Sequence, residues 1–217
     1  MIDVFEAENE FYRLCDPGRL GKFLAHAKLY ELSVNLPGDF AEVGVFKGAS
    51  FSRFRKLARL FHPDYARKFY GFDVFGPFPD SDWEADDKML AELRELDGST
   101  SIGKSELETI LEAQGLADNV NLIEGDVTKT LPEFFDENPY TAFSIVNIDL
   151  DLYGPTKLAL EFLYPRVVKG GVVILDDYAG GFPGANRAVE EYLQEQSLDV
   201  EIQKFPYTLT PSFIVKQ

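Results

Sequence analysis

Two apolar stretches of the chain end in pairs of carboxylates. SIVNIDLDLYGP carries Asp149 and Asp151, and GVVILDDY carries Asp176 and Asp177. Both have the apolar content of buried strands, and the carboxyl ends of neighbouring parallel strands meet at one edge of a sheet. Asp149, Asp176 and Asp177 should therefore converge, and anions so close together repel and raise one another's pKa. The only basic residue that the local sequence offers as a counter-charge is Arg187.

A bound divalent cation would remove this repulsion. Asp149, Asp176 and Asp177 offer three oxygen ligands and no His or Cys, which suits a hard ion, with Mg²⁺ preferred over Ca²⁺ and Mn²⁺. The alternative is that these acids are solvated at the ends of their strands without a metal. Asp151 has a second interpretation, because it or Gly154 can begin the helix that follows.

A turn that could hold a nucleoside cofactor follows the first predicted strand, in the sequence EVGVFKGAS. Gly44 and Gly48 allow a tight turn and a close approach to a ligand. Phe46 replaces a glycine of the G-x-G-x-x-G pattern that binds dinucleotides, and Glu42 would repel a pyrophosphate. A carboxylate here instead suits a cofactor with an ammonium group, and S-adenosylmethionine has one in addition to its sulfonium. Ser50, in the same turn, completes this group of candidate cofactor-binding residues.

The next two predicted strands also end in acids. Asp73 closes the second strand, where it can accept hydrogen bonds from ribose hydroxyls, and Asp126 follows the third, where it could bind the adenine amino group. The ribose feature is common to nicotinamide enzymes and methyl-donor enzymes, so it does not separate them. Such residues at three successive strand ends favour nucleoside binding over simple turns.

The elements that position these residues alternate along the chain. Hydrophobic spacing predicts helices over residues 1–35, 50–61, 84–96, 104–116, 130–138, 156–167 and 185–196. It predicts strands over residues 37–46, 66–75, 119–126, 144–149, 171–177, 199–205 and 212–216. The alternation indicates an α/β fold with a doubly wound, mostly parallel sheet. The last two strands are joined by a segment too short for a crossover helix, so they should form an antiparallel hairpin. A seven-stranded sheet with a C-terminal antiparallel hairpin is the Rossmann-like fold of class I methyltransferases, here with extra N-terminal helices.

Composition limits the class of protein. The 217 residues, 45% of them hydrophobic, fit one methyltransferase domain over 1–217, with an N-terminal helical cap at 1–35 and a lid or insert at 76–116. Phe78 and Trp83 in this insert could stack on a sugar or cover the core. The net charge of −16 argues against nucleic acid and anionic membrane as partners.

The single cysteine and the hydropathy give further expectations. Cys15 has no partner for an intramolecular disulfide and no cluster for a zinc site, and a small buried hydrophobic residue is favoured over a nucleophile. The acidic N-terminus does not have the pattern of a signal peptide, and no stretch approaches the roughly 20 apolar residues of a membrane span. A cytoplasmic protein is therefore expected.

Six stretches between residues 37 and 192 resemble, in order, the macrocin O-methyltransferase-like (TylF-type) family of S-adenosylmethionine- and Mg²⁺-dependent sugar methyltransferases. They are PGDFAEVGVFKGAS, FYGFDVFGPFP, EGDVTKTLP, NIDLDLYGPT, LYPRVVKGGVVILDDY and GFPGANRAVEEY. The nearest members act on nucleotide-linked deoxyhexoses. The resemblance implies that Asp149, Asp176 and Asp177 bind Mg²⁺. It also implies that the methyl donor lies along Glu42, Gly44, Asp73 and Asp126. Many relatives have Ser before the Thr of the DLY motif, whereas this chain has Pro155 before Thr156, so the sugar specificity of that loop does not carry over.

The predicted activity is a Mg²⁺-dependent transfer of a methyl group to a hydroxyl of a deoxysugar, in nucleotide-linked form or attached to a natural product. Mg²⁺ chelated by two vicinal hydroxyl oxygens would lower the pKa of the nucleophile and fix its direction. Asp149 is the candidate proton acceptor, and His26 is an alternative base. His62 is expected to end a helix, where the dipole favours it.

Three other functions stay open at this point. The same fold could methylate a catechol-like diol, a nicotinamide-dependent oxidoreductase could bind at the same strand ends, and a non-catalytic module could bind the cofactor without turnover. The exposed N-terminal helices and the lid could form a homodimer interface.

Overall fold

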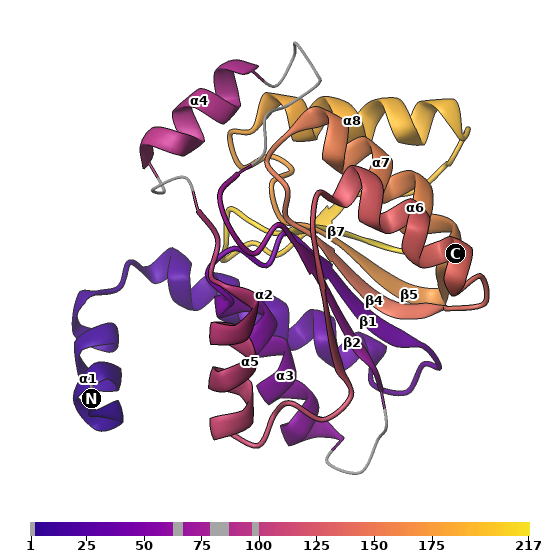
Figure 1. Ribbon diagram of the computed structural model, residues 1–217. Helices are drawn as coiled ribbons and strands as arrows, with labels where there is room; N and C mark the ends of the chain where they lie inside the picture. The colour runs from indigo at the N-terminus through magenta and orange to yellow at the C-terminus, as the bar shows by residue number, and fades with distance from the viewer. Residues whose placement is uncertain (1–2, 63–66, 79–86, 97–99) are drawn as a thin grey trace.

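The structure is a computed structural model, and it describes residues 3–62, 67–78, 87–96 and 100–217. Seven strands form one sheet in the order β3-β2-β1-β4-β5-β7-β6 (Figure 1). The strands are β1 (Asp39–Val43), β2 (Phe69–Asp73), β3 (Val120–Glu124), β4 (Phe143–Ile148), β5 (Val167–Leu175), β6 (Gln203–Lys204) and β7 (Ser212–Val215). The helices are α1 (Val4–Leu14), α2 (Pro17–Ser33), α3 (Ala49–Phe61), α4 (Asp87–Leu96), α5 (Lys104–Ala113), α6 (Val127–Glu137), α7 (Tyr153–Leu163) and α8 (Pro183–Glu195), with a 3₁₀ turn η1 (Tyr164–Arg166) after α7.

The sheet confirms the predicted class I methyltransferase architecture. Strands β1 to β5 pair in parallel, β7 pairs antiparallel with β5, and β6 pairs antiparallel with β7. The chain order reverses direction between β1 and β4, which is the switch point where ligands bind in open α/β sheets. The loops that follow β1, β2, β4 and β5 therefore meet at one place.

The last hairpin is shorter than the predicted strand 199–205. Only Gln203 and Lys204 pair with β7. The preceding side chains of Val200 and Ile202 pack against the core without strand pairing. Apolar alternation therefore predicted the burial of this segment correctly but overstated its length as a strand.

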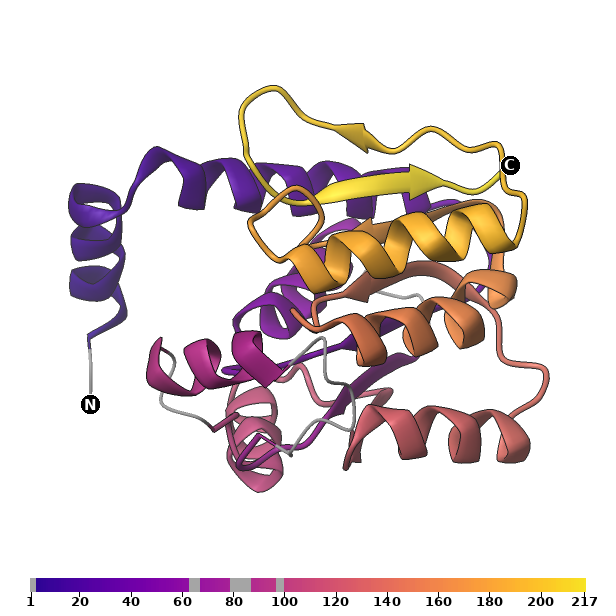
Figure 2. The same ribbon diagram turned by 90° about the horizontal axis from the view of Figure 1, so that it is seen from above.

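Helices cover both faces of the sheet, as Figures 1 and 2 show. Side chains that alternate along each strand divide between the two faces. On one face Val43, Val146 and Val173 pack under α6, α7 and α8. On the other face Phe40 and Ile145 pack under α2, α3 and α5. This second face also carries the polar residues of the site, so α2 and α3 cover its floor.

The predicted N-terminal helical cap consists of two helices that meet near Asp16. The Asp16 side chain accepts a hydrogen bond from the backbone N–H of Gly18, and Pro17 occupies the first helical position. Helix α2 is buried through Ala25, His26 and Leu29, whereas α1 has no buried residue and projects from the body (Figure 2). Cys15 ends α1 and is half-buried rather than buried, because α1 does not contribute to the core.

The predicted insert at 76–116 contains two different helices. Helix α5 packs into the core through Leu107 and Leu111, and α4 stands clear of the sheet in Figure 1. Phe78 lies 6.0 Å from Phe46, ring centre to ring centre. Trp83 lies outside the described residues. Among the helices that the structure describes, none has the length and apolarity to cross a membrane.

Candidate active site

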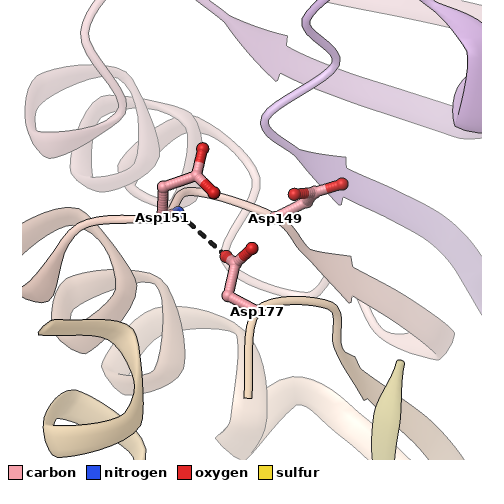
Figure 3. A group of neighbouring side chains, drawn as sticks. All are labelled: Asp149, Asp151 and Asp177. Carbon is pink, nitrogen blue, oxygen red and sulfur yellow. Dashed lines mark hydrogen bonds between the residues drawn. The ribbon is translucent and has the colours of Figure 1, made fainter. Parts of the chain in front are cut away.

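Three carboxylates converge where β4 and β5 end. Oxygen atoms of Asp149, Asp151 and Asp177 lie within 4.8 Å of one another, and Figure 3 shows the Asp177 carboxylate directed at the backbone nitrogen of Asp151. Asp177 Oδ2 accepts hydrogen bonds from the backbone N–H groups of Leu150, at 3.0 Å, and Asp151, at 2.8 Å. The carboxylate that follows β5 therefore holds the loop that follows β4.

Asp151 belongs to this group rather than serving as a helix cap. The N-cap residue of α7 is Leu152, and Asp151 has a left-handed backbone with φ of 60°. Among residues other than Gly, Asp and Asn adopt this conformation most readily. Gly154 lies within the first turn of α7, so neither residue proposed as a cap has that role.

The electrostatics of the group favour a bound cation. Burial and then the charges of Asp176 and Asp177 raise the pKa of Asp149 well above its ordinary value. Burial and then the charge of Asp151 raise the pKa of Asp177 in the same way. Asp149 and Asp177 therefore favour their neutral forms beside Asp151. A divalent cation bound between the three acids would favour the charged form of each and so stabilise the group.

Asp176 does not join the group that Asp149, Asp151 and Asp177 form. Consecutive residues at the end of a strand point to opposite sides, and Asp176 faces α2 instead. There Asp176 Oδ2 accepts a hydrogen bond from Lys22 Nζ at 2.6 Å, and Asp176 Oδ1 lies 3.7 Å from His26 Nε2. In this structure Asp176 therefore lies outside the group, which Asp151 joins instead. That Asp176 binds the metal stays a prediction.

The counter-charge also differs from the prediction. Arg187 pairs with Glu191 at 2.7 Å and lies over the ring of Tyr153, whereas the cation beside the acids is Lys22. Although burial disfavours the charged form of Asp176, its contacts with His26 and Lys22 prevail and lower its pKa to about 2. Sequence reasoning missed Lys22 because 154 positions separate it from Asp176. The one local signal was the spacing of Lys22 and His26, which places both on one face of a helix.

His26 is buried beside the acids but is poorly arranged to act as a base. The guanidinium of Arg53 lies 3.0 Å from His26 Nδ1 and has only donors, so Nδ1 accepts. In the neutral ring the proton is then on Nε2, which faces Asp176. Burial lowers the pKa of His26, and its ring stacks on Phe54. His62, as expected, is the residue that ends α3.

Gly44 joins the cofactor turn to the acid group. It has φ of 87°, and a Cβ at this position would lie 1.6 Å from the carbonyl oxygen of Asp149. The Asp149 N–H also donates to the carbonyl of Val43 at 3.0 Å. The absence of a side chain at Gly44 therefore permits a close contact with the backbone of Asp149, whether or not a ligand also approaches this turn.

Glu42 lies in the floor beneath this turn with no exposed surface. The Ser50 hydroxyl donates to Glu42 Oε1, while Oε2 has no hydrogen-bond partner among the described residues. Asn147 is the register partner of Glu42 on β4, and both of its side-chain polar atoms are also buried without a partner there. Burial raises the pKa of Glu42 to about 8. Buried polar atoms of this kind normally have a partner, so the floor has capacity for a polar ligand or water.

The other predicted cofactor residues support neighbouring loops. Asp73 Oδ2 accepts from the N–H of Phe46 at 2.8 Å, and Oδ1 accepts from the N–H of Phe75 at 2.9 Å. Each carboxylate oxygen has a further lone pair for a ribose hydroxyl. Asp126 caps α6 through the N–H of Thr128. Gly48 begins α3 in a left-handed conformation.

Most of the chain matches a known protein family. A family model described as macrocin O-methyltransferase (TylF) matches residues 20–210. The chain belongs to this family. The match thus runs from within α2 to the loop before β7 and includes all the candidate site residues.

Two curated members of natural-product pathways are similar in sequence. The 8-demethyl-8-(2,3-dimethoxy-alpha-L-rhamnosyl)-tetracenomycin-C 4'-O-methyltransferase of Streptomyces olivaceus is 34% identical over 164 residues, which are 74% of this chain and 60% of that protein. The demethyldecarbamoylnovobiocin O-methyltransferase of Streptomyces niveus is 32% identical over 161 residues, 73% of this chain and 59% of that protein. The chain therefore matches less than two thirds of the length of either relative.

One solved methyltransferase structure is similar over nearly the whole chain. The calicheamicin methyltransferase CalS11 superposes with a TM-score of 0.80 at 26% identity, over 99% of this chain and 86% of CalS11. CalS11 is described as a TDP-rhamnose 3'-O-methyltransferase. The superposition supports the macrocin O-methyltransferase fold for the chain, including its N-terminal helices.

Proposed function

We propose that the protein is an S-adenosylmethionine-dependent and Mg²⁺-dependent O-methyltransferase whose acceptor is a hydroxyl of a deoxysugar. One observation carries the proposal: Gly44, in the predicted donor turn, contacts the backbone of Asp149, in the acid group. A methyl donor and a metal-bound hydroxyl would then meet within one site. The related tetracenomycin and calicheamicin enzymes act on rhamnose derivatives, which supports a deoxysugar as the acceptor class.

The residues present fit a divalent cation. The acid group supplies only carboxylate oxygens, which suit a hard cation. Burial and neighbouring charges disfavour the ionised forms of Asp149 and Asp177, and a cation would offset that cost. Mg²⁺ bound here would lower the pKa of a chelated hydroxyl and neutralise the charge that forms on its oxygen. Asp177 would fix the position of the loop through its two backbone hydrogen bonds, and Asp149 would bind from the end of β4.

The residues present also fit the methyl donor. Glu42 Oε2 and the Asn147 amide, which have no hydrogen-bond partner in the part of the chain that the structure describes, provide a buried polar floor beneath the turn at Gly44. S-adenosylmethionine supplies an electrophilic methyl group on sulfur, together with an ammonium group that a Glu42 carboxylate could bind. Asp73 would accept the ribose hydroxyls from the end of β2, and Asp126 stays a predicted contact of the adenine.

Two residues can take the proton of the acceptor hydroxyl. Asp149 is the acceptor predicted from sequence, and metal ligation would compete for its lone pairs. Asp151 is a second candidate, because it is half-exposed at the mouth of the site and lies beside Asp177. Asp149→Asn and Asp151→Asn distinguish the two candidates. The residue that acts as the base is the one whose replacement abolishes turnover but leaves metal affinity unchanged.

The proposal is tested by transfer of a labelled methyl group. The protein is incubated with labelled S-adenosylmethionine and a panel of nucleotide-linked deoxysugars, glycosylated natural products and catechols, with Mg²⁺ or with EDTA. We expect transfer to a deoxysugar that EDTA abolishes and Mg²⁺ restores. Full transfer in EDTA would overturn the metal requirement, and transfer to catechols alone would overturn the acceptor class. If the protein binds the donor tightly but transfers to none of the acceptors, a binding module without turnover is favoured.

A further inference from the structure

Helix α2 presents two basic side chains to Asp176. Lys22 and His26 lie one helical turn apart, and both face this carboxylate, at 2.6 Å for Lys22 Nζ and 3.7 Å for His26 Nε2. Asp176 is only 5% exposed, so the contact is screened little by water. Asp176 Oδ1 has no hydrogen-bond partner among the described residues, which leaves one oxygen of this acid unsatisfied.

The orientation of His26 is fixed from behind. Arg53, from α3, donates to His26 Nδ1 at 3.0 Å, which leaves the Nε2 proton directed at Asp176. The stacked contact with Phe54, at 4.7 Å between ring centres, restricts the ring further. The contacts with Arg53 and Phe54 therefore fix the His26 ring, with its Nε2 facing Asp176.

Lys22 is different, because it can leave. Its side chain is 25% exposed, and a flexible four-carbon stem carries the ammonium. The charges of Asp149 and Asp177 also act on this ammonium, in addition to its direct contact with Asp176. Lys22 thus lies where a cation is attracted by Asp149, Asp176 and Asp177.

We propose that Lys22 is an internal counter-cation that competes with the divalent metal for Asp176, so that metal binding releases the Lys22 side chain from the site. This inference rests on the metal site of the proposed function. With Lys22 in place, Asp176 Oδ2 accepts its hydrogen bond, and the group of close carboxylate oxygens consists of Asp149, Asp151 and Asp177. When Lys22 departs, Asp176 becomes available as a further ligand.

The first test measures metal affinity without the methyl donor. Mn²⁺ and Mg²⁺ are titrated by calorimetry into the wild type, Lys22→Met and Lys22→Arg. Lys22→Met removes the competing charge and keeps the length of the side chain, so metal should bind about tenfold more tightly or better. Lys22→Arg should bind metal more weakly than the wild type, because a guanidinium holds a carboxylate through two donors. Lys157→Met is the matched control: Lys157 pairs with Glu195 at 2.7 Å, away from the acids, and its loss should not change the affinity.

The second test measures whether Lys22 is released. Brief acetylation followed by mass spectrometry reports the reactivity of each lysine, and the reactivity of Lys22 should rise several-fold on addition of Mg²⁺ while that of Lys157 stays constant. The proposed competition would be wrong if the wild type and Lys22→Met bound metal with equal affinity. It would also be wrong if Mg²⁺ did not change the labelling of Lys22. Neither result would argue against the metal site itself. The absence of metal binding in all variants would instead overturn the metal site itself, and with it this inference.

Discussion

Gly44 and Asp149 contact each other through their backbones, with no room for even a methyl group between them. A Cβ on Gly44 would lie 1.6 Å from the Asp149 carbonyl oxygen. The backbone of the predicted donor-binding turn is therefore in direct contact with the backbone of the predicted metal ligand Asp149. A change that displaces the backbone of one would displace the backbone of the other.

Replacing Gly44 by Ala tests this contact. A left-handed conformation alone costs an L-residue about 1–2 kcal/mol, and the overlap with Asp149 adds to that cost. We expect Gly44→Ala to lower the free energy of unfolding and to weaken metal binding together. Gly115→Ala is the control, since Gly115 has φ of 63° and nothing within 4 Å of an added Cβ. If thermal unfolding shows equal losses for the two variants, the contact with Asp149 has no special role.

Replacing Asp149 by Asn tests the acid group. The variant keeps the shape of the side chain but removes one charged ligand, so we expect metal affinity to fall at least about tenfold and methyl transfer to be abolished. Donor affinity should stay within about twofold, because the side chain of Asp149 is not among the predicted donor contacts. Asp136→Asn, at an exposed position of α6, should match the wild type. Loss of donor affinity in Asp149→Asn, measured by calorimetry, would place Asp149 in the donor pocket instead.

The buried Glu42 should make stability depend on pH. Its pKa is raised in the folded state from 4.5 to about 8, so the folded protein binds more protons than the unfolded chain between these values. Stability then falls as pH rises, by up to roughly 1.4 kcal/mol per pH unit for this group. Glu42→Gln should remove that part of the dependence. Urea unfolding in EDTA from pH 5 to 8 gives the difference between the two proteins, and parallel curves would contradict a neutral Glu42.

Binding of the methyl donor should release a proton near neutral pH. Glu42 is neutral below its pKa of about 8, and a carboxylate there is what the ammonium of the donor would bind. Calorimetry of donor binding in two buffers with different ionisation enthalpies measures the protons released. We expect close to one for the wild type at pH 7 and fewer for Glu42→Gln. Equal release by both proteins would show that Glu42 does not meet the ammonium.

The homodimer stays a prediction, and α1 provides its test. Phe11 and Leu14 are 45% and 76% exposed, and none of the residues of α1 is buried. A helix this short is marginal alone in water, so we expect it to pack against a second copy. The double change Phe11→Ser and Leu14→Ser should weaken a dimer at least about tenfold in light scattering. Tyr140→Ser, an exposed aromatic at 96%, is the control, and a monomeric wild type would refute the prediction.

Much of the fold could be predicted because it follows from local pattern. The alternation of apolar strands with amphipathic helices determines the order of elements, and the short connection before β7 requires an antiparallel pair. The acids at the ends of β4 and β5 could also be located, because strand ends meet at one edge. Which of two consecutive acids faces the group could not be predicted, since that depends on where β5 ends relative to Asp176.

Contacts between residues far apart in the sequence could not be predicted from local sequence patterns. Lys22 reaches Asp176 only because α2 crosses the face of the sheet that carries Asp149 and Glu42, and no spacing in the sequence encodes that crossing. The same limit applies to Arg53 and His26, which meet only when α2 and α3 pack together. Glycine patterns predicted a tight turn at Gly44, but not that the contact would be with Asp149.

The carboxylate of Asp73 holds the N–H groups of Phe46 and Phe75, and so fastens the loop after β1 to the loop after β2. For protein engineering, this makes the two loops a single exchangeable module. A chimera that imports one loop from a relative would leave an amide or a carboxylate of the other without its partner. Exchange of these loops with those of a relative should therefore succeed only when both loops are transplanted together with Asp73.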